Sequence, residues 1–400
     1  MRKRGVWGNR GYRRLWAARV VSFLGDSMGL VALLLLVSRG ADRAFAVALL
    51  LLAGDLVPTA VAPLAGALSD RLEPRRLMVG CELAQGGLVL AIAVTSPPLV
   101  LLLGLVAARA TLAQIFAPAS RSVVPTLVGT ADLEQAYAGL GFGTYGLDVA
   151  GPVLAAVTVP LVGVRGVLVG DAVTFGVSAL LLRGLPSAPR LAREPGGAGL
   201  LREARAGLSA VAGHPVLLPL TVGFCAVVAF NGVDDVALGF LGRDVLQGGE
   251  SGASLLYGAS GLGLLFGFAV LARIRPGVAA RLLVAGFALS SLGNLATGLA
   301  WAVWVAAATQ LVRGVGISLI EVGSNSLIAR TVPSALRGRA FANVYGAVGV
   351  AAGVSYLLGG LLLDFAGPRT TFVVAGLGGL VSTALAAPLL TRRAAADPAG

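Results

Sequence analysis

Long apolar stretches recur along the whole chain, and each is long enough to cross a lipid bilayer. A helical span needs about 20 consecutive apolar residues, and windows of this kind occur twelve times in the 400 residues. The predicted spans are 15–37, 45–68, 77–95, 99–120, 137–162, 164–185, 216–241, 252–272, 279–299, 301–322, 340–363 and 370–390. The sequence therefore predicts an all-α membrane protein with twelve transmembrane helices.

The composition indicates the same class of protein. Hydrophobic residues make up 56% of the chain and charged residues 12%, whereas about a quarter of the residues are charged in an ordinary soluble domain. A soluble fold of this size could not bury so much apolar surface. Glycine occurs 57 times, about twice its usual share of roughly 7%. Because small residues let membrane helices approach closely, the spans are expected to form packed bundles.

The basic residues define an orientation in the membrane. With the N-terminus inside, the cytoplasmic segments carry 23 basic residues and the outer loops carry 5. Since cytoplasmic loops are enriched in Lys and Arg, we expect a multi-pass protein of the cell (plasma) membrane with both termini in the cytoplasm. This bias accounts for most of the net charge of +12, so nucleic-acid binding is not expected.

The two halves of the chain resemble each other. Arg109 and Arg313 are 204 residues apart, and the longest polar stretch, 186–215, lies midway between the halves. We therefore expect an N-terminal six-helix half over 1–185, a cytoplasmic linker over 186–215 and a C-terminal six-helix half over 216–400. Two pseudo-symmetric halves around a central site are the architecture of many secondary transporters.

A short charged segment joins the second and third predicted spans. It reads Gly66-Ala67-Leu68-Ser69-Asp70-Arg71-Leu72-Glu73-Pro74-Arg75-Arg76. It resembles the loop between helices two and three of the major facilitator superfamily, in which Gly-x-x-x-Asp-Arg is followed by clustered basic residues. Glu73 and Pro74 stand where that family usually has a glycine.

This resemblance implies a conformational latch at the cytoplasmic face. In the family, the matching aspartate holds the two halves together in the outward-facing state. Here its expected partners are the amide-rich start of the eleventh span and the basic side chains beside it. The residues assigned to the latch are Gly66, Asp70, Arg71, Arg75, Arg337 and Arg339.

Further motifs resemble the exporters of this superfamily. Gly143, Gly151 and Pro152 in the fifth span resemble the glycine-rich motif of its antiporters, although Ala155-Ala156 replaces a second glycine pair. Arg109 resembles the mid-membrane arginine that the family uses in proton transfer. The resemblance extends to the proton-coupled drug-efflux branch that contains macrolide and siderophore exporters.

Ionisable side chains inside predicted spans are the candidates for mechanism, since each costs about 2.5 kcal/mol or more at the centre of a span. Asp26 lies near the midplane, and its spacing from Arg19 and Ser22 places all three on one helix face. Asp55 and Asp148 could be proton sites, counter-ions of Arg109 or packing residues. The residues assigned to proton coupling or to the substrate cavity are Asp26, Asp55, Arg109, Asp148, Asn231, Gln310 and Arg313.

The sequence therefore predicts a transporter and not an enzyme. We expect a monomeric proton-coupled antiporter that exports small hydrophobic or amphipathic molecules, such as a drug, a natural product or a siderophore. Its partners would be the substrate, protons and the bilayer, with no cofactor and no metal. Two alternatives stay open: an importer or uniporter of a polar metabolite, and a non-transporting membrane scaffold or sensor.

The latch assignment predicts the effect of removing one charge. Asp70→Ala should bias the protein toward the inward-facing state, because a few kcal/mol shift such populations strongly. Cysteines placed in the cytoplasmic cavity should then be labelled faster, and turnover should slow. Glu250→Ala in an outer loop should change neither quantity. Unchanged labelling and turnover in Asp70→Ala would restrict the role of this segment to topology.

Overall fold

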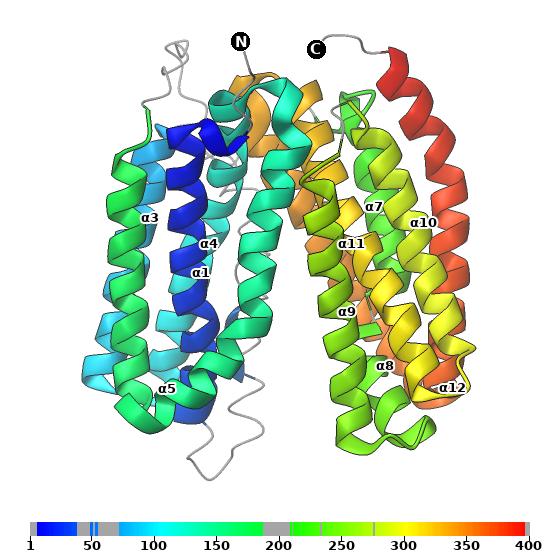
Figure 1. Ribbon diagram of the computed structural model, residues 1–400, viewed down its shortest axis with the longest axis horizontal. Coiled ribbons are helices and arrows are strands. Elements are labelled where there is room, and N and C mark those ends of the chain that lie inside the picture. The colour runs from blue at the N-terminus through cyan, green and yellow to red at the C-terminus, as the bar shows by residue number, and fades with distance from the viewer. Residues whose placement is uncertain are drawn as a thin grey trace. The chain divides into compact units, whose positions relative to one another are not determined.

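The computed structural model describes residues 6–37, 49–50, 53–54, 72–186, 209, 211–232, 234–274 and 277–396. The chain divides into two compact units. The first unit contains residues 1–129, 146–208 and 333–343, and the second contains residues 130–145, 209–332 and 344–400. Both units consist of packed helices, in agreement with the predicted all-α fold (Figure 1).

In the described part of the chain, the first unit contains four long helices. They are α1 (Arg10–Val37), α3 (Pro74–Thr95), α4 (Leu99–Val128) and the later part of α5 (Leu133–Arg183). Pro74 occupies the first turn of α3, where its missing N–H costs no intrahelical hydrogen bond. The apolar core of this unit joins all four helices through side chains such as Leu33, Ile92, Val106 and Phe175.

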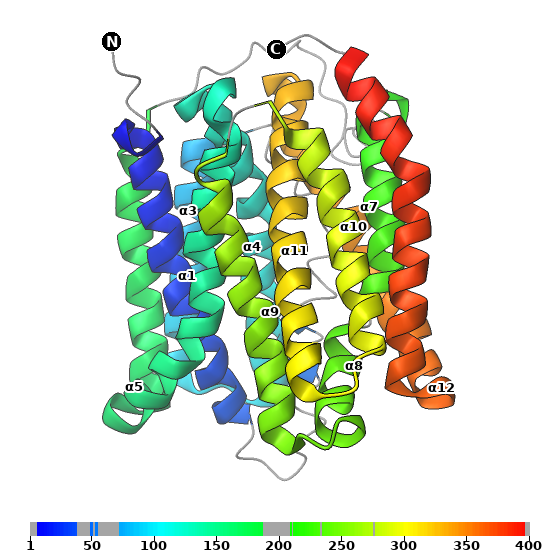
Figure 2. The same cartoon turned by 45° about the vertical axis from the view of Figure 1, so that its right-hand side comes forward.

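The second unit contains the helices of the C-terminal sequence half. They are α7 (Leu217–Asn231), α8 (Asp234–Phe240), α9 (Gly249–Leu271), α10 (Ala279–Gly298), α11 (Val303–Thr331) and α12 (Arg337–Ala396). Residues 337–343 at the start of α12 belong to the first unit. Helices α9, α10 and α11 lie side by side in both views (Figures 1 and 2). The predicted seventh span is interrupted, because α7 ends at Asn231 and α8 begins at Asp234.

Two helices are far too long for a single crossing. Helix α5 has 51 residues and α12 has 60 residues, so at about 1.5 Å per residue each far exceeds the roughly 30 Å of a bilayer core. Each helix bends sharply at a glycine with positive φ, Gly163 (φ 73°) and Gly367 (φ 77°). Because only glycine adopts this conformation readily, these two positions divide α5 and α12 into two spans each, close to the predicted breaks.

The candidate membrane spans agree with the prediction in the part of the chain that the structure describes. Eight helices there are long and apolar enough to cross a bilayer. Two of these are the bent helices, which supply two spans each, and α7 with α8 covers the predicted seventh span. The second span, 45–68, lies almost entirely outside the described residues. The described residues thus account for eleven of the twelve predicted spans.

Large apolar side chains cover the outside of the helices. Examples are Leu161, Trp301, Trp304 and Phe365, which are mostly exposed. Trp301 lies in the turn between α10 and α11, and Trp304 lies in the first turn of α11. Tryptophan is enriched where a span meets the membrane–water interface. An exposed apolar surface of this extent would be unstable in water and suits contact with lipid.

Glycines allow the helices of the second unit to pack at very short distances. A Cβ atom at Gly314 on α11 would overlap the backbone of Ser260 on α9. A Cβ atom at Gly316 would lie 2.5 Å from the backbone nitrogen of Ser290 on α10. The excess of glycine in the sequence is thus explained, at these positions, by close contact between helix backbones.

The start of α5 packs within the second unit, although it belongs to the first half of the sequence. Glu134 is completely buried there. Its Oε2 accepts a hydrogen bond from Arg330 Nη2 at 2.7 Å, and its Oε1 accepts one from the Gly277 backbone at 3.2 Å. Tyr145, on the same segment, stacks on Phe268 of α9 with ring centres 5.5 Å apart. This segment is held by a charged contact and an aromatic contact.

The buried pair predicts a loss of stability. Glu134→Ala leaves the Arg330 guanidinium without this carboxylate, and breaking a buried pair in this way costs about 3–5 kcal/mol. We expect a clearly lower thermal unfolding midpoint in detergent. Asp244→Asn removes a carboxylate whose ion pair with Arg243 is exposed, and it should change the midpoint little. Equal midpoints for the two variants would contradict a stabilising role for Glu134.

Candidate functional site

An ion pair between two helices of the first unit forms the centre of the candidate site. Arg109 of α4 donates a hydrogen bond from Nη1 to Oδ1 of Asp26 on α1. Both side chains are partly buried. The sequence left the counter-ion of Arg109 open, and the structure pairs this arginine with Asp26. A charge-assisted bond of this kind offsets part of the cost of placing two charges inside a span.

The same face of α1 also reaches α3. Ser22 lies one turn before Asp26, and its hydroxyl donates a hydrogen bond to Glu82 Oε1 at 3.4 Å. Glu82 is 2% exposed, and its Oε2 has no hydrogen-bond partner in the described part of the chain. Arg19, a further turn away, lies over the ring of Phe116 at 5.4 Å and acts electrostatically on Glu82.

A third carboxylate approaches α1 from the later part of α5. Asp171 is 3% exposed, and its carboxylate lies against Gly25 and Gly29, where a Cβ atom would overlap its oxygens. These glycines are four residues apart, so they form one groove on the helix. The sequence interpretation missed Asp171. Its signal was a carboxylate inside the span 164–185, together with the Gly25-x-x-x-Gly29 spacing opposite it.

These groups form one electrostatic cluster. Asp171 interacts with Asp26, Arg109 and Glu82, and Glu82 interacts with Asp26 and Arg19. The described members of the cluster are thus three carboxylates and two guanidinium groups. If all five are ionised, the cluster carries one net negative charge. An uncompensated charge inside a membrane protein is costly, so this arrangement favours the uptake of one positive charge.

The second unit contains a polar cluster of different character. Arg313 on α11 is buried and donates from Nη1 to Ser260 Oγ at 3.2 Å. Gln310, one turn earlier, donates to Thr297 Oγ1 of α10 at 3.1 Å. Asn231, at the end of α7, donates to Ser291 Oγ at 3.1 Å. The structure thus places Arg313 and Gln310 among hydroxyl groups, whereas Arg109 faces carboxylates.

The structure describes only some of the remaining residues that were predicted for the cavity and the antiporter motif. Asp55 lies outside the described residues, and so does the side chain of Asp148, whose backbone belongs to α5. Gly143, Gly151 and Pro152 also lie on α5. A Cβ atom at Gly151 would overlap Ser27 of α1, so this glycine lets the two helices approach closely.

The predicted latch is likewise placed only in part. Gly66, Asp70 and Arg71 lie outside the described residues. The Nε atom of Arg75 lies 3.4 Å from Oε1 of Glu73, and its Nη1 donates a hydrogen bond to the Leu185 carbonyl oxygen at 3.2 Å. The other assigned residues, Arg337 and Arg339, lie at the start of α12, in the segment 333–343 of the first unit. The latch itself stays a prediction.

The helices carry apolar surfaces that suit contact with lipid, and a charged cluster is buried between spans of the first unit. These features are typical of a multi-pass membrane protein of the transporter class. The sequence profile of the Major Facilitator Superfamily matches residues 15–276 and 236–399. The chain belongs to the Major Facilitator Superfamily. It is therefore a transporter of small molecules and not an enzyme.

Relatives and solved structures agree with this family. The chain is 24% identical over 376 residues to the uncharacterized MFS-type transporter YfiS of Bacillus subtilis, a match that covers 92% of this chain and 90% of that protein. Its fold is similar to the human organic anion transporter MFSD10 (TETRAN), with a TM-score of 0.75, 19% identity, and coverage of 94% and 99% of the two chains. A bacterial homologue of the iron transporter ferroportin in an outward-facing state is similar with a TM-score of 0.75, 17% identity, and coverage of 96% and 99%.

The Asp26–Arg109 contact predicts coupling between substitutions. Asp26→Asn and Arg109→Gln should each lower the thermal midpoint in detergent, because each leaves the other charge inside the span without this partner. The double variant should lose less than the sum of the two single losses. Contacting residues typically show about 0.5–3 kcal/mol of such coupling. Strictly additive losses would show that the two side chains act independently in the folded protein.

Proposed function

We propose that this transporter is a proton-coupled antiporter that exports small hydrophobic or amphipathic molecules and acts as a monomer. Its place would be the plasma membrane, with both termini in the cytoplasm, as the distribution of basic residues favours. The observation that carries the proposal is the charged cluster of the first unit, in which Asp26 and Arg109 are paired beside Glu82 and Asp171.

The charge of the cluster supports proton coupling. With all described members ionised, the three carboxylates and two guanidinium groups give the cluster one net negative charge. Binding one proton removes this excess, and releasing the proton restores it. The cost of an uncompensated charge inside a span is several kcal/mol, so the protonation state changes the free energy of any conformation that alters the solvation of the cluster. Coupling to protons requires such a difference between states.

Export, as opposed to uptake, is supported by the glycine pattern of α5. Gly143, Gly151 and Pro152 resemble the antiporter motif of the superfamily, and Gly151 lies directly against Ser27, the residue after Asp26 on α1. A change in the protonation of the cluster therefore occurs next to the contact between α1 and α5. This proximity supports a response of the motif to the charge of the cluster.

Alternating access would require movement of the start of α5. Residues 130–145 pack in the second unit through Glu134 and Arg330, whereas residues 146–183 of the same helix pack in the first unit. A helix shared in this way can act as a connection between the units. The predicted Asp70 latch would act together with this connection.

Transport by reconstituted protein tests the proposal. In proteoliposomes with an imposed proton gradient, the wild-type protein should move ethidium, a fluorescent amphipathic cation, against the direction of proton flow. Asp26→Asn should abolish the gradient-driven movement, because the four remaining charged groups balance without an added proton. Binding of ethidium should stay detectable in this variant.

The matched control is Asp244→Asn, which removes a carboxylate that is exposed at Leu241–Val245. It should transport as the wild type does. Full gradient-driven transport by Asp26→Asn would move proton coupling to other groups. Movement of ethidium in the same direction as protons would instead favour an importer, and no movement of any tested molecule by the wild type would favour a scaffold or sensor.

A further inference from the structure

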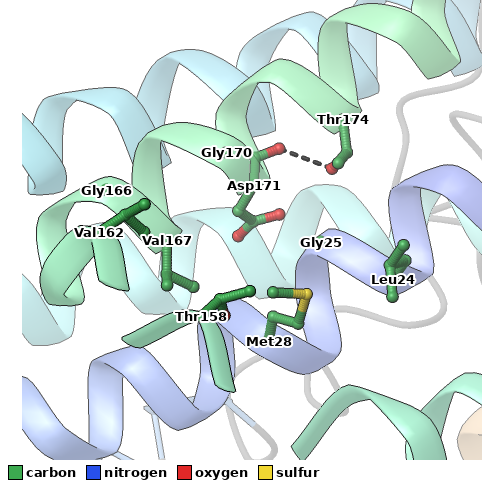
Figure 3. Close-up of a pocket in the computed structure, with 10 residues that line it drawn as sticks. All are labelled: Leu24, Gly25, Met28, Thr158, Val162, Gly166, Val167, Gly170, Asp171 and Thr174. Carbon is green, nitrogen blue, oxygen red and sulfur yellow. Dashed lines mark hydrogen bonds between the residues drawn. The ribbon is translucent and has the colours of Figure 1, made fainter. Parts of the chain in front are cut away.

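A cavity of about 250 Å³ lies between α1 and the two parts of α5, on either side of the bend at Gly163. Its wall is mainly apolar or small, with Met28, Thr158 and Val167 among the residues that surround it. Figure 3 shows Met28 facing Thr158 and the Asp171 carboxylate above them. Asp171 is the only ionisable residue among those that line the described cavity.

The carboxylate of Asp171 has an incomplete set of hydrogen bonds. Its Oδ1 is buried and has no hydrogen-bond partner among the described residues. The Thr174 hydroxyl lies beside this carboxylate and donates a hydrogen bond to the Asp171 backbone carbonyl at 2.7 Å. Buried polar atoms without partners cost free energy, and a ligand that satisfies Oδ1 would remove this cost.

The neighbouring charges do not neutralise Asp171. The ionisable groups around it are Asp26 on α1, Glu82 on α3 and Arg109 on α4. Arg109 donates a hydrogen bond to Asp26, and Glu82 adds a further negative charge that interacts with Arg19. Around Asp171, the described cluster therefore lacks one positive charge. Either a proton or a cationic ligand can supply it.

We propose that this cavity binds a small lipophilic monocation, such as a protonated or quaternary amine, with its charged group at Asp171 and its apolar part against Met28, Thr158 and Val167. Drug-sized ligands occupy cavities of about 300–1,000 Å³, so a cavity slightly below that range suits a molecule with one ring. The groove of Gly25 and Gly29 brings Asp171 close to α1 and leaves no space for a side chain at either position.

The bound cation and the proton compete for one carboxylate. When the cation enters, the Asp171 carboxylic acid releases its proton to the solution, and the carboxylate then balances the charge of the cation. The net charge of the cluster is the same in both states. The inference rests on the proposed function for its role in antiport, but binding and proton release can be measured without transport.

Benzyltrimethylammonium is a suitable probe, because its charge does not depend on pH. Purified wild-type protein in detergent should bind it, should release about one proton for each bound cation into a weakly buffered solution, and should bind it more tightly as the pH rises. An uncharged analogue, 2-phenylethanol, should bind at least about tenfold more weakly, since a hydrogen-bonded or ionic contact to a charged group is worth about 1.5–3 kcal/mol.

Two variants of the site and one control separate the outcomes. Asp171→Asn should bind the cation at least about tenfold more weakly and release no proton. Thr158→Phe should fill the cavity and weaken binding while leaving every charged group in place. Asp244→Asn, outside the cavity, should behave as the wild type in both measurements. Thermal midpoints of all variants establish that each is folded.

The proposal is overturned if Asp171→Asn binds the cation as the wild type does, if binding releases no proton, or if the wild type does not bind the probe. Equal binding of the cation and 2-phenylethanol would identify the cavity as an apolar space for lipid. Proton-driven efflux without Asp171-dependent binding would refute this site alone. Asp171-dependent binding with proton release, but without proton-driven efflux, would refute the proposed antiport and leave the site intact.

Discussion

The free-energy cost of placing charged groups inside a bilayer constrains how the helices of the first unit pack. Asp26 and Arg109 are tolerated between α1 and α4 because they bind each other. Helix α1 meets carboxylates from two other helices, Glu82 on α3 and Asp171 on α5. The packing of this unit therefore depends on the ionisation of its buried groups, and a change of one charge alters a contact that three neighbouring helices share.

Small residues make this cluster possible. Gly25 and Gly29 give the Asp171 carboxylate its position against α1, and Gly151 lets the earlier part of α5 approach Ser27. The residue between these contacts on α1 is Asp26, which faces α4. One helix thus combines close backbone packing on one side with an ion pair on another, so a change of charge in the cluster would act next to the contacts between α1 and α5.

Much of the fold could be predicted from hydrophobic length alone. Spans of about 20 apolar residues identified the helices, and the breaks near 163 and 367 fall at glycines that bend α5 and α12. Asp26 and Arg109 were identified because a charge in an apolar span is conspicuous. Their pairing could not be deduced, since it depends on how α1 packs on α4.

Asp171 shows the limit of the same reasoning. A carboxylate in the span 164–185 was visible in the sequence, but its importance comes from Gly25 and Gly29, which lie more than a hundred residues earlier and meet it only through helix packing. The motif-based assignments at Asp70, Arg337 and Arg339 rest on resemblance, and the Glu134–Arg330 pair has no comparable motif. Contacts between helices that are far apart in the sequence cannot be deduced from residue spacing.

The proposed coupling depends on one exchangeable proton in the charged cluster of the first unit. Infrared difference spectroscopy of the purified protein measures this directly, because a protonated carboxyl group in an apolar environment has a carbonyl band distinct from that of a carboxylate. The spectrum of the wild type should contain one buried carboxyl band that is lost as the pH rises, and this band should be absent from Asp171→Asn. A spectrum without such a band, or one with the band unchanged in Asp171→Asn, would contradict the proposed coupling.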